Sequence, residues 1–512
     1  MPLILLLGLF LAYSWMTPEV QAPNERSRIY LTLAMMESGT VSVNDQIRQF
    51  GVPFDVARRG GMYYSDKAPG SSIVALPAMK AYQMLGGDVS SMEQLVVFTR
   101  WAVMIPFALL TLFLLRWLLV SLAIREEIAD LVVIVFALGT SFFHYGSAFY
   151  GHALVTCFSL AAACCVMKSL KREQQKAGRR EIAWQWGAGF CGAMAFLMEY
   201  QAVVILGALF LGFIAREEHR VWAPLASFSA GAFIPTVTVF VYNTLAFGHP
   251  LSTSYSHLVH GSARAVHESG LFGITYPSWE AIYGLILSSS RGLLFCAPLV
   301  LVGVMGLGLL WKRARWLAIY AGLSVAGFLV LATGARDVWF AGWSFGPRLL
   351  IPIFGLAAVG AALVLEELEE RAPVFLGILG GLFLGSVFYN TFVSSTFPEL
   401  PPRITAPLTS VSVELVKGQS VSPNLGQSIL GMEATASVIL LVAGALLLGG
   451  LAISRVALTG PVSLSKNSKL KVAVGCAAAL ALFMAALWLY PEQTSPESVE
   501  SLVERLAHRE EM

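Results

Sequence analysis

Charged side chains that could do chemistry gather near the N-terminus, between residues 17 and 69. A positioned carboxylate can take the proton of a hydroxyl nucleophile, and cations can stabilise a phosphate leaving group. This stretch holds six basic and six acidic residues: Arg26, Arg28, Arg48, Arg58, Arg59 and Lys67, and Glu19, Glu25, Glu37, Asp45, Asp55 and Asp66. Acid–base and phosphate chemistry are therefore both available to this segment.

The first part of the segment, NERSRIYLTLAMMESG (residues 24–39), has a helical pattern. We expect Asn24 to be the N-cap, Glu25 to lie in the first turn, Arg28 one turn further on, and the helix to end at Gly39. Three apolar residues share one face: Ile29, Leu33 and Met36. The pattern also allows an interfacial helix with solvated arginines, in which Glu25 interacts only with the helix dipole.

A second cluster follows in YYSDKAPG, residues 63–70. Pro69 and Gly70 break the chain here, so the turn fixes Asp66 and Lys67 next to Tyr64. A carboxylate beside an ammonium suits a phosphate or metal site, and an ordinary capped loop would have the same residues. The sequence shows no His or Cys spacing typical of a zinc site, and the metal, if any, is unknown.

The composition of the chain predicts that most of it lies in a lipid bilayer and not in water. Of the 512 residues, 56% are hydrophobic and 13% charged, whereas soluble proteins have roughly 25% charged residues. This excludes a soluble enzyme and predicts an all-α polytopic membrane protein with about 13 transmembrane helices. The apolar runs are 1–16, 92–115, 127–143, 150–167, 184–198, 201–215, 221–245, 292–311, 316–333, 348–365, 373–393, 433–454 and 472–490. Residues 71–86, broken by Pro77 and Lys80, predict an interfacial or re-entrant helix.

The basic residues predict the orientation of these helices. Lys and Arg are denser in one set of loops, which places the N-terminus inside and the C-terminus outside. The basic, cytoplasmic set is 116–126, 168–181, 216–220, 312–315, 366–371 and 455–471. The outer set is 17–91, 246–290, 334–347, 395–432 and 491–512. We divide the chain into a catalytic module (1–365), C-terminal helices (366–490) and an outer tail (491–512).

Other polar residues lie at the predicted outer ends of the spans, where ionisable groups tend to face a cavity or a partner. Arg100 and Arg348 are the basic residues among these positions. The candidates for binding substrate or acceptor are Tyr64, His144, His152, Glu199, Tyr255, His257 and Trp343. For each histidine taken alone, a core residue with a satisfied hydrogen bond is the simpler interpretation. The loop 246–290 carries Tyr255 and His257, and it is either a lid over a sugar or lipid headgroup or a set of interfacial anchors.

Several of these segments resemble GT-C membrane glycosyltransferases, in particular bacterial protein-mannosyltransferase-like enzymes and lipid A aminoarabinose transferases. The resemblance covers residues 17 to about 365. It rests on NERSRIYLTLAMMESG followed by YYSDKAPG, on VVFTRWAVMIPFAL, and on YNTLAFGHPLSTSY, SSSRGLLFCAPL and FAGWSFGPRLLIP. The chain departs from the pattern at Asn24, where these enzymes usually have Asp.

The resemblance implies an inverting glycosyltransferase at the periplasmic face of the bacterial inner membrane. It implies a polyprenyl-phosphate-linked sugar as donor and a lipid, glycan or protein hydroxyl as acceptor, and some members bind a divalent cation. Glu25 matches the second acid of the family pair, and Lys67 matches the lysine that faces phosphate. Arg28 and Arg100 match basic positions approximately, and Arg348 joins them as a candidate for binding phosphate. The general base stays open among Glu25, Asp55 and Asp66.

Two other classes of protein compete with this interpretation. A transporter or flippase of lipid-linked sugars would fit the hydropathy, although no internal repeat of the kind common in transporters is seen. A non-catalytic envelope assembly protein would also fit. The net charge of +2 gives no reason to expect a nucleic-acid partner.

Overall fold

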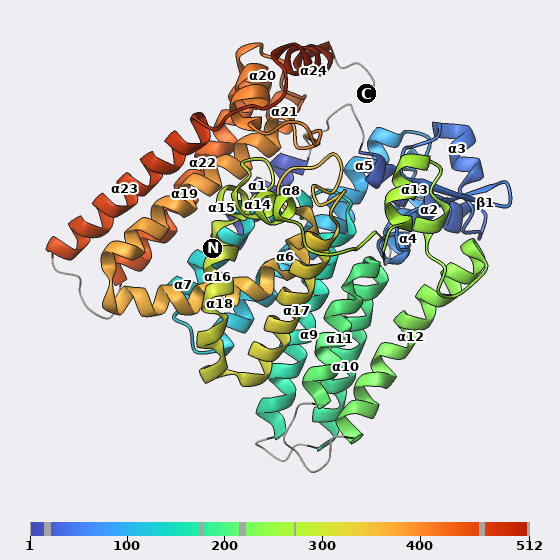
Figure 1. Ribbon diagram of the computed structural model, residues 1–512, viewed down its shortest axis with the longest axis horizontal. Helices are drawn as coiled ribbons and strands as arrows, with labels where there is room; N and C mark the ends of the chain where they lie inside the picture. Colours follow the sequence, from blue (N-terminus) through green and yellow to red (C-terminus); the bar gives the residue numbers. More distant parts are fainter. Residues whose placement is uncertain are drawn as a thin grey trace.

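The computed structural model describes residues 2–14, 22–173, 178–214, 222–270, 273–459 and 466–508. Helices make up most of this part of the chain, as expected. Figure 1 shows the long helices fanning away from one end of the molecule, where the short helices and a small hairpin gather. Parts of the expected loops 168–181, 216–220 and 455–471 lie outside the described residues, as does the end of the tail.

The first half of the chain contains the following elements: α1 (Pro2–Ser14), α2 (Pro23–Glu37), α3 (Asn44–Phe50), β1 (Val56–Arg59), β2 (Met62–Ser65), α4 (Gly70–Met84), α5 (Met92–Thr99), η1 (Arg100–Met104), α6 (Ile105–Ser121), α7 (Glu126–Leu138), α8 (Phe142–Tyr145), α9 (Gly151–Glu173), α10 (Gly178–Met198), η2 (Tyr200–Ala202), α11 (Val203–Ile214) and α12 (Trp222–Phe247).

The second half contains η3 (Ser254–His257), α13 (Gly261–Glu268), α14 (Trp279–Leu287), α15 (Leu293–Cys296), α16 (Pro298–Arg313), α17 (Arg315–Gly334), η4 (Arg348–Leu350), α18 (Ile351–Arg371), α19 (Pro373–Thr396), η5 (Leu408–Ser412), α20 (Val413–Lys417), α21 (Leu425–Leu430), α22 (Ala434–Thr459), α23 (Lys466–Trp488) and α24 (Pro496–His508).

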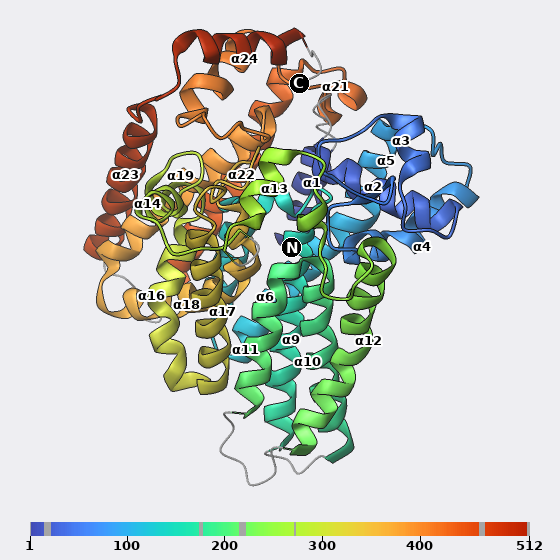
Figure 2. The same cartoon turned by 45° about the vertical axis from the view of Figure 1, so that its right-hand side comes forward.

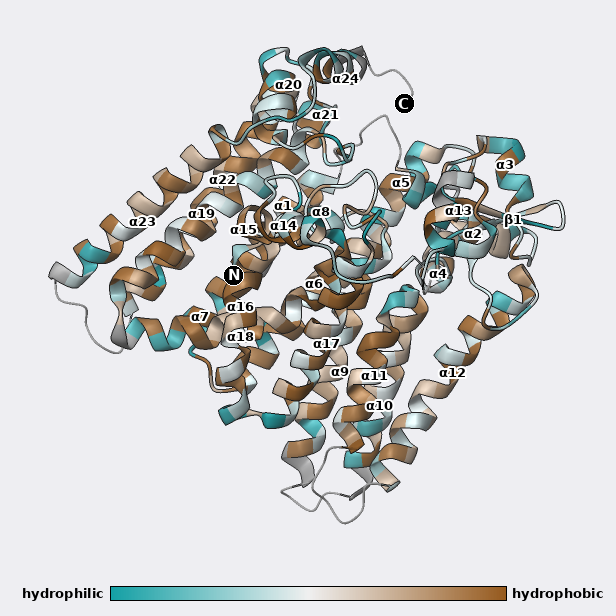
Figure 3. Ribbon diagram, in the orientation of Figure 1, coloured by the Kyte–Doolittle hydropathy of each residue, from teal (hydrophilic) through white to brown (hydrophobic). Residues whose placement is uncertain are grey.

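Within the described residues, eight helices are long and apolar enough to cross a membrane. They span Met92–Ser121, Gly151–Leu170, Trp222–Phe247, Arg315–Gly334, Arg348–Glu369, Pro373–Thr396, Ala434–Thr459 and Ser468–Trp488. Figure 3 shows hydrophobic residues along these helices and hydrophilic ones at α3 and the hairpin. The chain is a multi-pass membrane protein, and the number of crossings and their orientation remain predictions.

The other five expected spans correspond to α1, α7, α10, α11 and the pair α15 and α16. Of these, α10 is an uninterrupted helix of 21 residues, and the others are shorter helices or, in the last case, two helices in succession. The expected run 292–311 breaks after Cys296 because Pro298 has no backbone N–H and opens a new helix at its first turn.

Neighbouring helices approach closely where glycines face one another. α16 packs along α18, as α9 packs along α10 and α19 along α23. A Cβ added to Gly303 on α16 would lie 2.0 Å from the carbonyl oxygen of Ala357 on α18. Small residues of this kind allow the close backbone contact typical of membrane helices.

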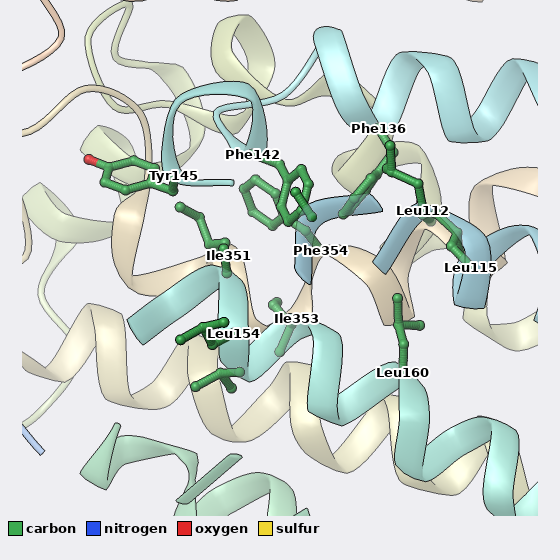
Figure 4. Close-up of a cluster of buried hydrophobic side chains, with 14 of the residues drawn as sticks. Leu112, Leu115, Phe136, Phe142, Tyr145, Leu154, Leu160, Ile351, Ile353 and Phe354 are labelled. Carbon is green, nitrogen blue, oxygen red and sulfur yellow. The ribbon is translucent and has the colours of Figure 1, made fainter. Parts of the chain in front are cut away.

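A buried cluster of apolar side chains holds the short helix α8 in place. In Figure 4, Phe142 on α8 lies beside Phe136 on α7 and Phe354 on α18. The rings of Phe136 and Phe142 are 4.6 Å apart, centroid to centroid. This packing fixes the position of His144, which follows on the same short helix.

Residues 22–91 fold into a cap of helices and a hairpin, which lies beside the ends of α10 and α12 (Figure 2). Strand β1 pairs antiparallel with β2, with Val56 opposite Ser65 and Arg59 opposite Met62. The turn uses Gly60 and Gly61, both with positive φ. The all-α prediction missed this hairpin, because its strands have only four residues each.

Helix α2 confirms the helix expected from residue 24, but not its cap. The helix begins at Pro23, and Ala22 is the N-cap without a side-chain hydrogen bond. Proline favours this first position since its missing N–H would be unpaired there anyway. Arg28 on this helix is 0% exposed, so the alternative of an interfacial helix with solvated arginines is wrong for that residue.

Candidate functional site

The turn after β2 holds one ammonium between two carboxylates. Lys67 Nζ lies 2.9 Å from Asp55 Oδ2 and 2.9 Å from Asp66 Oδ2. The hydroxyl of Ser27 on α2 donates to Asp66 Oδ1 at 3.3 Å. We call Asp55, Asp66 and Lys67 the lysine cluster.

Burial and charge set the protonation of this cluster. Burial raises the pKa of Asp66 to about 6; the neighbouring Asp55 adds to this, and Lys67 opposes it. Burial also opposes the charge on Lys67, but the two carboxylates outweigh it and raise the pKa of Lys67 above its ordinary value. Asp66 therefore titrates closer to neutrality than an ordinary aspartate.

Arg28 joins α2 to the segment between α10 and α11. It forms an ion pair with Glu199, and it donates to Asn24 Oδ1 at 2.9 Å and to Ser71 Oγ at 2.5 Å. Burial opposes ionisation of Glu199, but Arg28, His152 and Lys67 together outweigh it and hold the pKa of Glu199 below its usual range. His152 Nδ1 lies 3.7 Å from the same carboxylate.

Two glycines make room for the end of α10 and for Glu199. A Cβ on Gly151 would lie 2.2 Å from Glu199 Oε1, and a Cβ on Gly70 would lie 2.4 Å from the carbonyl oxygen of Leu197. Real Cβ atoms do not approach so closely, so α9 can contact Glu199, and α4 the end of α10, only through glycine.

The loop after α12 covers the lysine cluster. Ser254 Oγ donates to the carbonyl oxygen of Asp66 at 2.6 Å, and Leu258 forms an isolated bridge with Ala57 on β1. Tyr255 stacks on His267 with ring centroids 4.4 Å apart. These contacts favour the interpretation of this part of the loop as a lid, whereas Trp279 further along is 84% exposed, as expected of an anchor.

A second, separate ion pair lies at the start of α2. Arg100 donates to both oxygens of Glu25, at 2.9 and 2.6 Å, and the backbone N–H of Phe149 donates to Glu25 Oε1 at 2.8 Å. Burial opposes ionisation of Glu25, but Arg100 outweighs it and lowers the pKa of Glu25 below its ordinary value. Arg100 sits in the π-helical turn η1 between α5 and α6, a local widening that is frequent at functional sites.

A pocket lies beside this pair, between the N-terminal helices and the segment after α19. Its empty volume is about 420 Å³ including space open to solvent, and about 10 Å³ of it admits the centre of a water molecule. Its lining includes Tyr13, Arg100, His144, Ser394, Ser395 and Glu399. We call it the Glu399 pocket.

Arg348 lies between the lysine cluster and the Glu399 pocket. Its guanidinium lies over the ring of Tyr150 at 5.4 Å, and it is within electrostatic range of Glu399 and Asp55. It donates to the carbonyl oxygen of Ala341, and its Nε is buried without a hydrogen-bond partner in the described part of the chain. None of the described carboxylates lies within 4 Å of Arg348, unlike Arg28, Lys67 and Arg100.

The structure thus divides the residues predicted from the sequence into four groups. The first is the lysine cluster with its neighbours Arg28, Glu199, His152 and Tyr255. The second lies at the Glu399 pocket and consists of Glu25, Arg100 and His144, and the third is Arg348, which lies between the two sites. The remaining three, Tyr64, His257 and Trp343, lie elsewhere. Tyr64 and His257 both pack on Phe247, and Trp343 is 42% exposed.

Most residues that line the Glu399 pocket were not found from the sequence, among them Tyr13, Ser394, Ser395 and Glu399. A signal existed for the last three, because SSTFPELPP places one carboxylate and two serines among apolar residues and prolines directly after a span. A lone carboxylate in such a context tends to be buried and paired. Glu399 is 6% exposed.

A divalent cation does not fit the carboxylates of the lysine cluster as they stand. Metal sites for hard cations gather several oxygen ligands, but Lys67 already lies between Asp55 and Asp66. In the ranges that the structure describes, there is no group of three His, Cys, Asp or Glu residues able to hold a metal.

The chain is similar to three solved membrane glycosyltransferases. With ArnT from Cupriavidus metallidurans in the apo state it shares 13% identity over 98% of this chain and 83% of ArnT, with a TM-score of 0.48. With the arabinosyltransferase EmbB from Mycobacterium smegmatis it shares 12% identity over 95% of this chain and 40% of EmbB, with a TM-score of 0.45. With the archaeal oligosaccharyltransferase AglB from Archaeoglobus fulgidus, in complex with an inhibitory peptide and a dolichol-phosphate, it shares 12% identity over 97% of this chain and 60% of AglB, with a TM-score of 0.46.

These three proteins belong to the GT-C superfamily, the group that the sequence motifs resemble. No protein-family model and no curated protein sequence matches the chain.

Proposed function

We propose that this protein transfers a sugar from a polyprenyl-phosphate donor to a hydroxyl group of an acceptor. The observation that carries the proposal is Arg348, a cation without a carboxylate partner among the described residues and with a buried, unpaired Nε. An uncompensated charge in such a place is costly unless an anion pairs with it. A phosphate group supplies that anion and accepts several hydrogen bonds from a guanidinium.

The lysine cluster gives the phosphate a second contact. Lys67 pairs with Asp55, whose charge also acts on Arg348, and we propose that Lys67 and Arg348 bind the same phosphate. Arg28 and Arg100 already have carboxylate partners, Glu199 and Glu25. In our proposal these two arginines position the site, while Arg348 and Lys67 bind the phosphate.

Asp66 is the first-loop carboxylate that we propose as the general base. A base works best when its pKa lies near the operating pH, and the pKa of Asp66 is raised to about 6. The acceptor hydroxyl gives its proton to Asp66 as its oxygen bonds to the sugar C1 carbon. The bond from C1 to the phosphate oxygen breaks, and its electron pair stays on the phosphate. Attack opposite the leaving phosphate inverts the anomeric configuration.

The proposal also includes the location of the enzyme. The lipid donor reaches the site through the bilayer, and the site faces the periplasm of a bacterial inner membrane, as the basic loops predict. The sugar and the acceptor, whether lipid, glycan or protein, stay open.

Binding of undecaprenyl phosphate to the purified full-length protein in nanodiscs tests the proposal. We expect Arg348→Met to weaken binding by about tenfold or more, as loss of a charged hydrogen bond does. The matched control is Arg336→Met, because Arg336 lies in the same segment but is exposed and interacts with Tyr276. Equal binding by Arg348→Met and the wild type would contradict the proposed phosphate site.

Transfer itself is measured with a panel of undecaprenyl-phosphate sugars, by mass spectrometry of the lipids and glycans that gain a sugar. The anomeric configuration of the product, read by NMR, tests inversion. Movement of the lipid-linked sugar across the bilayer without any product would favour the flippase alternative instead.

A further inference from the structure

The Glu399 pocket contains several buried polar atoms without partners. His144 Nε2, Ser394 Oγ and Ser395 Oγ have no hydrogen-bond partner in the described part of the chain, and all three residues line the pocket. Their exposures are only 2–3%. Buried polar groups are normally paired, so three unpaired ones around one pocket indicate a group that is missing from it.

The hydrogen bonds of Tyr13 and His144 indicate what kind of group the pocket can bind. Tyr13 Oη lies 2.6 Å from His144 Nδ1. If the tyrosine donates this bond, the imidazole proton is on Nε2, which faces Glu399 Oε1 at 3.5 Å. A donor and an acceptor at this separation can both bond to one hydroxyl group that lies beside them, about 2.8 Å from each, since a hydroxyl accepts and donates at once.

The charges at the pocket argue against an ionic ligand. Glu399 disfavours an anion and Arg100, held by Glu25, disfavours a cation. The free space for about one water-sized centre matches a single hydroxyl group better than a whole sugar ring.

We propose that the Glu399 pocket binds a hydroxyl group of the donor's sugar, with Glu399 accepting its proton in a hydrogen bond and His144 donating to its oxygen. The oxygen of this hydroxyl group can accept a second hydrogen bond, and Ser394 and Ser395 both line the pocket as donors. The proposal rests on the proposed function and adds the subsite that recognises the sugar.

The pocket is connected to the proposed phosphate site. Tyr150 donates to Glu399 Oε1 at 3.0 Å, and its ring lies under the guanidinium of Arg348. Arg291 connects the segment before Arg348 with the segment that carries Glu399, because it donates to the carbonyl oxygens of Phe340 and Leu400 at 3.1 and 3.0 Å. A sugar phosphate can therefore reach Arg348 with its phosphate and Glu399 with a sugar hydroxyl.

The test compares two probes on the full-length protein in nanodiscs: undecaprenyl phosphate, and undecaprenyl phosphate carrying a pentose or a hexose. We expect Glu399→Gln, and separately the pair Ser394→Ala and Ser395→Ala, to weaken binding of the best sugar-bearing lipid by about tenfold. Binding of the sugar-free lipid should change by less than about twofold. Glu414→Gln is the matched control, since Glu414 is exposed and pairs with Lys417 at the surface.

Each outcome decides a different statement. A subsite that only holds water, or no subsite, predicts that the variants bind both lipids like the wild type, and this overturns the inference alone. A purely structural role predicts equal weakening of both lipids, and this also overturns it. Wild-type protein that binds neither lipid contradicts the proposed function itself. The serine pair provides a mild variant in case Glu399→Gln fails to fold.

Discussion

The two buried charge clusters of this protein differ in how their charges balance. In the lysine cluster the ammonium group of Lys67 forms ion pairs with two carboxylates, Asp55 and Asp66. At the start of α2 the carboxylate of Glu25 forms an ion pair with Arg100 and accepts a hydrogen bond from the backbone N–H of Phe149. Burial raises the pKa of Asp66 to about 6, with Asp55 adding to the shift and Lys67 opposing it. Burial also opposes ionisation of Glu25, but the charge and hydrogen bonds of Arg100, together with the N–H of Phe149, keep the pKa of Glu25 low.

This difference separates a group suited to proton transfer from a group suited to holding structure. A carboxylate that titrates near neutrality can take and release a proton during turnover. A carboxylate with all its bonds satisfied by Arg100 and Phe149 is a weak base and a rigid link between α2, η1 and the segment before α9. The following predictions test this division, from the largest expected effect to the smallest.

Asp66→Asn should remove the proposed base and lower kcat for sugar transfer by ~10²–10⁴-fold, the usual contribution of general base catalysis. Binding of undecaprenyl phosphate should stay close to that of the wild type, because Lys67 keeps Asp55 as a partner. The measurement is the transfer rate at saturating donor. If Glu25→Gln loses all activity at unchanged stability while Asp66→Asn retains it, the roles of the two clusters are reversed.

The pH profile gives the same prediction a second readout. The carboxylate form of Asp66 is the active one, so the rate should fall about tenfold per pH unit below a pKa of about 6. Glu25 should leave no inflection in this range because its pKa is lowered. A rate that is flat from pH 5 to 8 would argue against Asp66 as the base.

Arg100→Met should destabilise the fold by ~3–5 kcal/mol, the usual cost of leaving one member of a buried ion pair behind. The double variant Glu25→Gln with Arg100→Met should recover part of the loss, since neither charge is then left alone. Thermal unfolding in detergent at fixed protein and lipid concentration measures both. A single variant as stable as the wild type would show that the Glu25–Arg100 pair is not a structural link.

The sequence predicted the lysine cluster better than the Glu399 pocket, and the reason is distance along the chain. Asp55, Asp66 and Lys67 lie within one loop, so a turn motif was enough to bring the last two together. The pocket combines Tyr13, Arg100, His144 and Glu399, whose proximity depends on how α1, η1, α8 and the end of α19 pack. No local pattern records that packing.

Local patterns were also least accurate where proline and short strands decide the outcome. Pro23 moved the start of α2 one residue before the expected Asn24 cap, and Pro298 divided an expected span into α15 and α16. The hairpin of β1 and β2 carries no long alternation that would separate it from a loop. Hydropathy, by contrast, located each of the eight long apolar helices, because twenty apolar residues leave a signal independent of tertiary contacts.

Gly151→Ala tests whether Glu199 belongs with the lysine cluster as a fixed partner of Arg28. The added Cβ would meet Glu199 Oε1 and the carbonyl oxygen of Met198, so the carboxylate must shift, at a cost of ~1–3 kcal/mol in stability. The control is Gly322→Ala on α17, where nothing lies within 4 Å and alanine should be neutral or slightly stabilising. Equal thermal stability of the two variants would show that Glu199 moves freely.

Asn24→Asp has the smallest expected effect and compares the two clusters most directly. Asn24 Oδ1 already accepts from Arg28 Nε, and an aspartate there would give Arg28 two carboxylates, as Lys67 has in the lysine cluster. The surplus acid should then have a raised pKa in the folded state, so the variant binds protons more tightly when folded. Its stability relative to the wild type should therefore fall as the pH rises above the unfolded value of about 4, by ~1–2 kcal/mol in total for a shift of about one unit. Asn44→Asp, outside both clusters in α3, controls for the added charge. A variant whose stability difference is the same at pH 4 and pH 7 would mean that the second carboxylate is fully paired, and that charge balance alone does not set the pKa values in this part of the protein.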